Sequence, residues 1–126
     1  MLISAEGPVS ADEVWLRYTE LSAWPGWAPQ ISRVDAPVEV IEHGTRGTVR
    51  GPVLTRVPFR IRSIDHQARR WSWWVGFGPL GVCMDHGVDE IPDGSRAWVR
   101  IHAHRWLVRP YVPVARLALS RLVRAG

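Results

Sequence analysis

The sequence predicts an α+β fold in which a helix near the C-terminus covers one face of an antiparallel sheet. About six consecutive segments between residues 38 and 106 alternate apolar with polar residues, and tight turns separate them, which is typical of antiparallel strands. The segment after Pro110 instead carries apolar residues at helical spacing. Because the apolar face of the sheet needs a cover, and this helix is the only long element left to provide it, we expect the two to pack together.

The start of the chain predicts a strand and then two short helices. Residues 1–6 are short and apolar, and a Gly-Pro pair ends the predicted strand. Ser10 is in the position of a helix N-cap, and Glu13, three residues later, completes a capping box. The helix should end near Ala23, because Pro25 disfavours helix in the residue before it. Residues 24–29 form a tight linker that leads into one helical turn.

The middle of the chain predicts a hairpin and a third strand. Residues 38–42 and 46–50 are the two predicted strands of the hairpin, and His43 and Gly44 form its turn. Residues 59–65 are the next strand. The side chains expected on its inward face are Phe59, Ile61 and Ser63.

Residues 71–90 are the centre of the predicted sheet. They form two strands around a Gly-Pro-Leu-Gly turn at residues 78–81. Residues 97–106 form the last predicted strand, after a Pro-Asp-Gly turn. Alternation places the following side chains on the inward face: Trp71, Trp73, Val75, Phe77, Val82, Met84, His86, Val88, Ala97, Val99, Ile101 and Ala103.

Composition limits the class of protein. The 126 residues are expected to form one domain, 1–126, with 46% hydrophobic and 22% charged residues, as in a soluble globular protein. No apolar run approaches the roughly 18 residues of a membrane span, and no signal peptide is visible. The single cysteine, Cys83, excludes an internal disulfide, and we expect a cytoplasmic location. The net charge is +4, because the chain has 16 basic residues, all of them arginine, and 12 acidic residues. This excess fits either arginines exposed to solvent or an anionic partner.

Two stretches of the sequence carry a family resemblance. The Val14-Trp15 pair, followed by Trp-Pro-Gly-Trp-Ala-Pro at residues 24–29, resembles the opening of START-like (SRPBCC) domains. Residues 84–96, with His86 in a strand before an Asp-Gly-Ser turn, are similar to the late hairpin of the same superfamily, which includes the polyketide cyclase/dehydrase and lipid-transport group. The resemblance implies a helix-grip fold: a curved antiparallel sheet of about 6–7 strands wrapped around the C-terminal helix.

The resemblance also implies a cavity between the sheet and the C-terminal helix that binds a hydrophobic or aromatic small molecule. Of the eight tryptophans, Trp27, Trp71 and Trp73 either line this cavity or fill it, and both alternatives stay open. The residues expected to contact the ligand are Trp27, Phe59, Ile61, Trp71, Trp73, Val75, Met84, His86, Val99, Ile101, Ala115 and Leu119.

No motif in the sequence specifies a reaction, so whether the protein is an enzyme stays open. His86 is the one candidate for catalysis, as an acid or base pointing into the cavity; the alternatives are a ligand contact and a core histidine. No cofactor is expected. No metal is expected either, because Arg100 shares the face of His102 and His104 and its charge disfavours a cation.

Three functions therefore remain. The first is binding of a hydrophobic small molecule without chemistry. The second is an enzyme that resembles a polyketide cyclase or dehydratase and holds a flexible chain folded. The third is an interaction module that uses the outer face of the sheet, with Trp74, Trp98, His102, His104 and its arginines. Nucleic acid is not the expected partner, because acidic residues are interspersed among the arginines.

Overall fold

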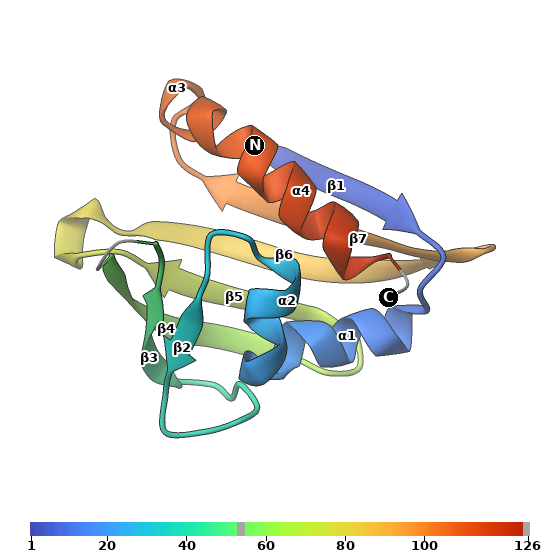
Figure 1. Cartoon of the computed structure of the whole chain (residues 1–126), viewed down its shortest axis with the longest axis horizontal. Coiled ribbons are helices and arrows are strands. Elements are labelled where there is room, and N and C mark those ends of the chain that lie inside the picture. Colours follow the sequence, from blue (N-terminus) through green and yellow to red (C-terminus); the bar gives the residue numbers. More distant parts are fainter. Residues whose placement is uncertain (53–54, 125–126) are drawn as a thin grey trace.

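The computed structural model describes residues 1–52 and 55–124. Within this part of the chain, seven antiparallel strands form one sheet in the order β1-β7-β6-β5-β4-β3-β2. The sheet curls into a half-barrel, and α4 lies along β1 and β7 on its concave side (Figure 1).

The strands are β1 Leu2–Gly7, β2 Arg33–Asp35, β3 Arg46–Arg50, β4 Arg56–Asp65, β5 Arg70–Val75, β6 Val82–Ile91 and β7 Gly94–His102. The helices and 3₁₀ turns are α1 Ala11–Thr19, η1 Leu21–Ala23, α2 Trp24–Trp27, η2 Gly78–Leu80, α3 Arg105–Val108, η3 Arg109–Tyr111 and α4 Val112–Leu122. The predicted α+β fold and its closing helix are confirmed.

The first helix begins where the capping pattern predicts. The Ser10 side chain accepts a hydrogen bond from the backbone N–H of Glu13 at 3.2 Å. The helix ends at Thr19, earlier than predicted, because Glu20 adopts an extended conformation and bridges to Val40. The 3₁₀ turn η1 follows. The short helix expected after the linker is α2, which is formed by the Trp-Pro-Gly-Trp residues themselves.

The strand predicted at residues 38–42 is wrong. The backbone of this segment pairs with the end of α1 and the start of η1 instead: Leu21 N–H donates to the Glu39 carbonyl and Ile41 N–H donates to the Thr19 carbonyl, both at 2.9 Å. The Ile41 side chain is fully buried. The segment that pairs with β3 is β2, earlier in the chain. The strand-like apolar pattern of residues 38–42 therefore reflects contact with α1.

Two further predictions on the later strands need correction. A bulge in β4 shifts the register between Ile61 and Ser63, so Ile64 pairs with Trp71 and takes the inward place expected for Ser63, which is exposed. The last strand, β7, ends at His102 rather than at residue 106, because residues 105–108 turn into α3. Trp106 is consequently 64% exposed.

The central strands carry the inward faces that alternation predicts. Trp71 and Trp73 of β5, His86 of β6 and Val99 of β7 are all buried on the concave side. Phe77, beyond the end of β5, is the exception and is exposed. From α4, the residues buried against the sheet are Ala115, Ala118, Leu119 and Leu122. The core therefore lies on the concave side of the sheet, where α1, α2 and α4 cover it.

The far end of α4 is fixed to the start of the chain. The Arg17 guanidinium donates from Nη1 to the Leu122 and Arg124 carbonyls at 2.9 Å, and Val9 N–H donates to the Val123 carbonyl at 3.2 Å. These bonds satisfy carbonyls that the last turn of a helix leaves without partners. Among the described helices, none is both long and apolar enough to cross a membrane.

Candidate functional site

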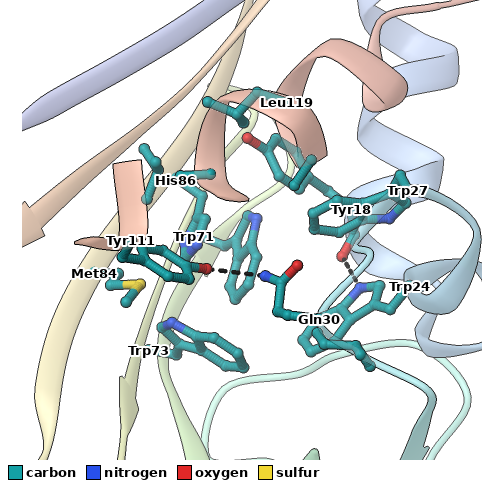
Figure 2. Close-up of a pocket in the computed structure, with 14 residues that line it drawn as sticks. Tyr18, Trp24, Trp27, Gln30, Trp71, Trp73, Met84, His86, Tyr111 and Leu119 are labelled. Atoms are coloured by element: carbon teal, nitrogen blue, oxygen red, sulfur yellow. Dashed lines mark hydrogen bonds between the residues drawn. The ribbon is translucent and has the colours of Figure 1, made fainter. Parts of the chain in front are cut away.

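A small hollow lies beneath α4, at the centre of the concave face. Its volume is about 40 Å³. Figure 2 shows that side chains from α1, α2, the central strands and α4 converge on it. The residues that line it are Tyr18, Trp24, Trp27, Gln30, Ile31, Trp71, Trp73, Met84, His86, Val99, Tyr111, Ala115, Ala118 and Leu119. We call this space the inner hollow.

Aromatic rings occupy most of the space beneath α4. Trp24 stacks on Trp71 with 5.6 Å between ring centroids, and Trp71 stacks on His86 at 3.8 Å with their planes 6° apart. Phe59 and Trp73 close the cluster, 5.4 Å apart. The remaining volume accommodates a water molecule or two, since one water requires roughly 10–15 Å³. A drug-sized ligand does not fit in the inner hollow as it stands.

A larger hollow opens beside the first, between strands β3 to β5 and the turn η3. Its volume is about 410 Å³, and most of its wall is apolar. The residues that line it are Gln30, Ile31, Val49, Gly51, Pro52, Thr55, Val57, Trp73, Val75, Met84 and Tyr111. We call this space the outer hollow. Gln30, Trp73 and Tyr111 are among the residues that line both hollows, so the two spaces share a wall.

A hydrogen bond crosses the junction of the two hollows. The Gln30 side chain follows α2 and donates from Nε2 to the Tyr111 hydroxyl of η3 at 2.9 Å (Figure 2). This bond connects the loop after α2 to the start of the closing helix. Four other buried polar atoms around the inner hollow have no hydrogen-bond partner among the described residues: Gln30 Oε1, Trp71 Nε1, Trp73 Nε1 and His86 Nδ1.

His86 is a neutral imidazole at physiological pH. Burial lowers its pKa from 6.5 to about 3, although the nearby Asp85 carboxylate and the Trp71 backbone oppose the shift. Its ring stacks on that of Trp71 in the neighbouring strand, and the residue is 7% exposed. A group with such a low pKa is a weak base near pH 7, whereas a general base works best with a pKa close to the operating pH.

The two tyrosines of the inner hollow are also uncharged. Burial raises the pKa of Tyr18, against the opposing effects of Arg70 and of the bond that its hydroxyl donates to the Trp98 carbonyl at 3.0 Å. Burial likewise raises the pKa of Tyr111, and the bond from Gln30 opposes it. Among residues 1–52 and 55–124, no aspartate, glutamate or arginine lines either hollow. Both spaces therefore present a neutral surface with a few polar groups.

The structure distributes the expected ligand contacts between the two hollows and the core. Those that line the inner hollow are Trp27, Trp71, Trp73, Met84, His86, Val99, Ala115 and Leu119. Val75 lines the outer hollow, together with Trp73 and Met84. Phe59, Ile61 and Ile101 are buried in the core and line neither hollow.

Sequence reasoning missed residues that come from helices and loops. Tyr18, Trp24, Gln30, Ile31 and Tyr111 line the inner hollow but lie outside the strands. The helical spacing of Tyr18 placed it on a buried face without indicating a ligand contact. No local pattern singles out Gln30 or Tyr111, because their position follows from how α2 and η3 pack across the sheet.

Polar side chains on the outer face of the sheet contact one another. The Asp85 carboxylate accepts a hydrogen bond from Ser72 Oγ at 2.8 Å and lies 2.7 Å from His102 Nε2. Burial alone would raise the pKa of Asp85. The contacts with His102 and Ser72 outweigh burial, so the pKa is lowered overall. The Arg70 guanidinium lies 5.0 Å from the centre of the Trp98 ring. Within residues 1–52 and 55–124, no group of three or more potential metal ligands comes together.

Comparison with known proteins places this geometry in a known fold. Neither a protein-family model nor a curated protein sequence matches the chain. Solved structures do match: the hypothetical protein jhp0584 from Helicobacter pylori, with a TM-score of 0.77 and 12% identity, over 98% of this chain and 83% of that one. CalU16 from Micromonospora echinospora matches with a TM-score of 0.74 and 15% identity, over 97% of this chain and 70% of CalU16. DynU16, from the dynemicin biosynthetic locus, matches at 0.79 and 14% identity; 97% of this chain aligns but only 45% of DynU16. The chain thus shares the helix-grip fold of these structures, which is the fold that its resemblance to START-like domains implied.

Proposed function

We propose that the protein binds a hydrophobic or aromatic small molecule, and that the body of this molecule occupies the outer hollow. The observation that carries the proposal is the mainly apolar space of about 410 Å³ bounded by Val49, Val57 and Val75. Its volume lies within the range of small-molecule sites, which is roughly 300–1,000 Å³. The helix-grip fold of the solved neighbours supports the proposal at the level of architecture only.

The expected affinity is modest. A bicyclic aromatic that buries about 200 Å² of apolar surface gains about 5 kcal/mol at 25 cal/mol per Å². That free energy corresponds to a Kd of roughly 0.2 mM, before any contribution from polar groups. At about ten times its Kd, such a probe adds about 1.4 kcal/mol to the free energy of unfolding, which raises the Tm by about 5 °C in a domain of this size.

Binding accounts for the site better than proton transfer does. The enzymatic alternative, a cyclase or dehydratase, would need an acid or a base in the site. His86 is the candidate, but burial lowers its pKa to about 3. The pKa of Tyr18 and that of Tyr111 are both raised. If a substrate is found, unchanged turnover by His86→Ala would remove His86 from any mechanism.

The test fills the outer hollow. In Val57→Trp an indole replaces a half-buried side chain in the wall of the outer hollow. We expect this variant to lose the Tm increase that wild-type protein shows with 2-methylnaphthalene. The control is Val40→Trp, the same change at an exposed residue outside both hollows, which should respond as wild type does. No response of wild-type protein to apolar aromatics, or an equal response of both variants, would refute binding in this hollow.

A further inference from the structure

We propose that one end of the half-barrel docks on an anionic lipid bilayer, with Trp106 and Leu107 of α3 entering the headgroup region and neighbouring arginines meeting lipid phosphates. The contact is peripheral, since only exposed turns take part in it. The inference goes beyond the proposed function, because it concerns a surface and its partner, and its test requires no bound ligand.

The first support is a set of exposed apolar side chains on two turns. On α3, Trp106 and Leu107 are each more than half exposed, and so are Phe77 and Leu80 in the turn between β5 and β6. Both turns lie at the same end of the sheet, where β5 and β7 end and β6 begins (Figure 1). We call these four residues the apolar rim. Large apolar side chains gathered at one end of a molecule are typical of a surface that contacts another molecule.

The second support is the positive charge at this end. Arg56, Arg105 and Arg109 are exposed and make no ion pair within the described residues. The loops after β3, β5 and β7, as far as the structure describes them, contain no aspartate or glutamate. Anionic lipids attract arginines that are held close to the bilayer surface. The charge of this end is therefore complementary to that of an anionic bilayer.

The same charges argue against a second copy of the chain as the partner. A two-fold interface through the apolar rim would bring Arg105 and Arg109 of one copy toward the same residues of the other, and like charges repel. The rim is also smaller than a stable protein interface, which takes roughly 20–30 residues on each side. A bilayer needs only a few inserted side chains, and tryptophan favours its interface because the indole is apolar with one polar N–H.

The third support is the position of the rim beside the outer hollow. Tyr111 of η3, which follows α3 directly in the chain, lines this hollow. Val75 at the end of β5 and Thr55 in the loop after β3 line it as well. Docking through the rim would thus place the outer hollow next to the bilayer, where hydrophobic molecules concentrate.

The experiment measures binding to sucrose-loaded vesicles by co-sedimentation at pH 7. Vesicles with about 30 mol% phosphatidylglycerol in phosphatidylcholine are compared with vesicles of phosphatidylcholine alone. We expect wild-type protein to bind the anionic vesicles at least about tenfold more tightly at low salt, since each arginine near an anionic surface contributes roughly fivefold. We expect most of this preference to disappear at about 1 M NaCl, where the Debye length is only about 3 Å.

A first pair of variants tests the apolar rim. Trp106→Ala combined with Leu107→Ala removes two exposed side chains that the core does not use. Binding to the anionic vesicles should fall roughly tenfold or more, because burial of one large apolar side chain is worth at least about that factor. The matched control is Leu16→Ala combined with Val40→Ala, two exposed apolar residues outside the rim, which should bind as wild type does.

A second pair of variants tests the arginines at equal net charge. Arg105→Gln combined with Arg109→Gln should weaken binding to the anionic vesicles by about tenfold or more. The matched control is Arg46→Gln combined with Arg60→Gln, which removes the same two charges from exposed, paired positions of β3 and β4. We expect the control to weaken binding by less than about threefold, because those residues are not part of the docking end.

The outcomes separate this inference from the proposed function. Failure of wild-type protein to bind anionic vesicles would overturn the inference and leave small-molecule binding in the outer hollow untouched. Equal weakening by the two arginine pairs would mean that net charge alone attracts the protein. Unchanged binding by Trp106→Ala with Leu107→Ala would mean that the rim stays outside the bilayer. Either result overturns the placement. Dimerisation in sedimentation equilibrium that this double variant abolishes, without vesicle binding, would assign the rim to a second copy of the chain.

Discussion

At the scale of single residues, His86 makes the stability of the protein depend on pH. Its pKa is about 3 in the folded protein and 6.5 ordinarily, so between these values the unfolded chain binds a proton that the folded chain does not. The free energy of unfolding therefore keeps its full value above pH 6.5 and falls as the pH drops toward 3. One such group accounts for about 1.4 kcal/mol per pH unit, or about 2 kcal/mol between pH 7 and 5.

The variant His86→Phe isolates this effect. A phenyl ring can keep the stack on Trp71, where the ring centroids are 3.8 Å apart, and cannot titrate. Urea unfolding at pH 7, 6 and 5 should show wild-type protein losing about 2 kcal/mol more than the variant. Parallel losses in the two proteins would mean that the imidazole is protonated in the folded state.

Residues on strands were predictable in a way that residues on loops were not. The inward positions of Trp71, Trp73 and His86 follow from alternation, since neighbouring side chains on a strand point to opposite faces. Gln30 and Tyr111 lie next to each other only because the fold brings the loop after α2 against η3, 81 residues away in sequence. No local period encodes such a contact, so the polar half of the candidate site emerges only from the three-dimensional structure.

At the scale of elements, α4 depends on α1 to satisfy its last turn. Arg17→Ala removes the two bonds that Nη1 donates to the Leu122 and Arg124 carbonyls, each at 2.9 Å. We expect the free energy of unfolding to fall by about 1–2 kcal/mol, because the two bonds are only partly buried or exposed and an ordinary net hydrogen bond is worth about 0.5–1.5 kcal/mol. Urea denaturation measures this loss as a lower midpoint, and the m-value should stay unchanged.

Arg17 also pairs with Glu13 at 3.6 Å, and this second role needs its own control. Glu13→Gln removes only the exposed i, i+4 ion pair, which contributes less than about 0.5 kcal/mol. If Arg17→Ala and Glu13→Gln cost the same, the carbonyl bonds contribute nothing to the anchoring of α4.

Whether a strand prediction was right or wrong depended on whether the segment pairs with a neighbour in sequence. The strands β5, β6 and most of β7 pair with sequence neighbours through tight turns, so local pattern and tertiary partner agree. Residues 38–42 carry an equally apolar pattern, but their backbone partners are Thr19 and Leu21, at the end of α1 and the start of η1. The bulge after Ile61 is also invisible to a strict period of two, because one extra residue exchanges the two faces.

At the scale of the whole molecule, indole rings fill most of the space between the sheet and α4. Trp24, Trp71 and Trp73 pack within 5.6 Å of one another, centre to centre, and leave only about 40 Å³ beneath α4. The larger free volume is displaced to the open end of the sheet, in the outer hollow. The packed aromatic core and the proposed ligand site thus lie on different parts of the concave face.

This division predicts that the tryptophans beneath α4 contribute more to the free energy of unfolding than the tryptophan on the outer face of the same strand. Trp71, 3% exposed, contacts Trp24 and His86 by stacking, so Trp71→Ala should lower the free energy of unfolding by about 3–5 kcal/mol in urea denaturation. Trp74→Ala, from the half-buried outer face of the same strand, should cost markedly less, because no enclosed cavity forms when it is truncated. Equal losses would contradict the claim that the stacked rings beneath α4 contribute more to stability than the outer face of the same strand.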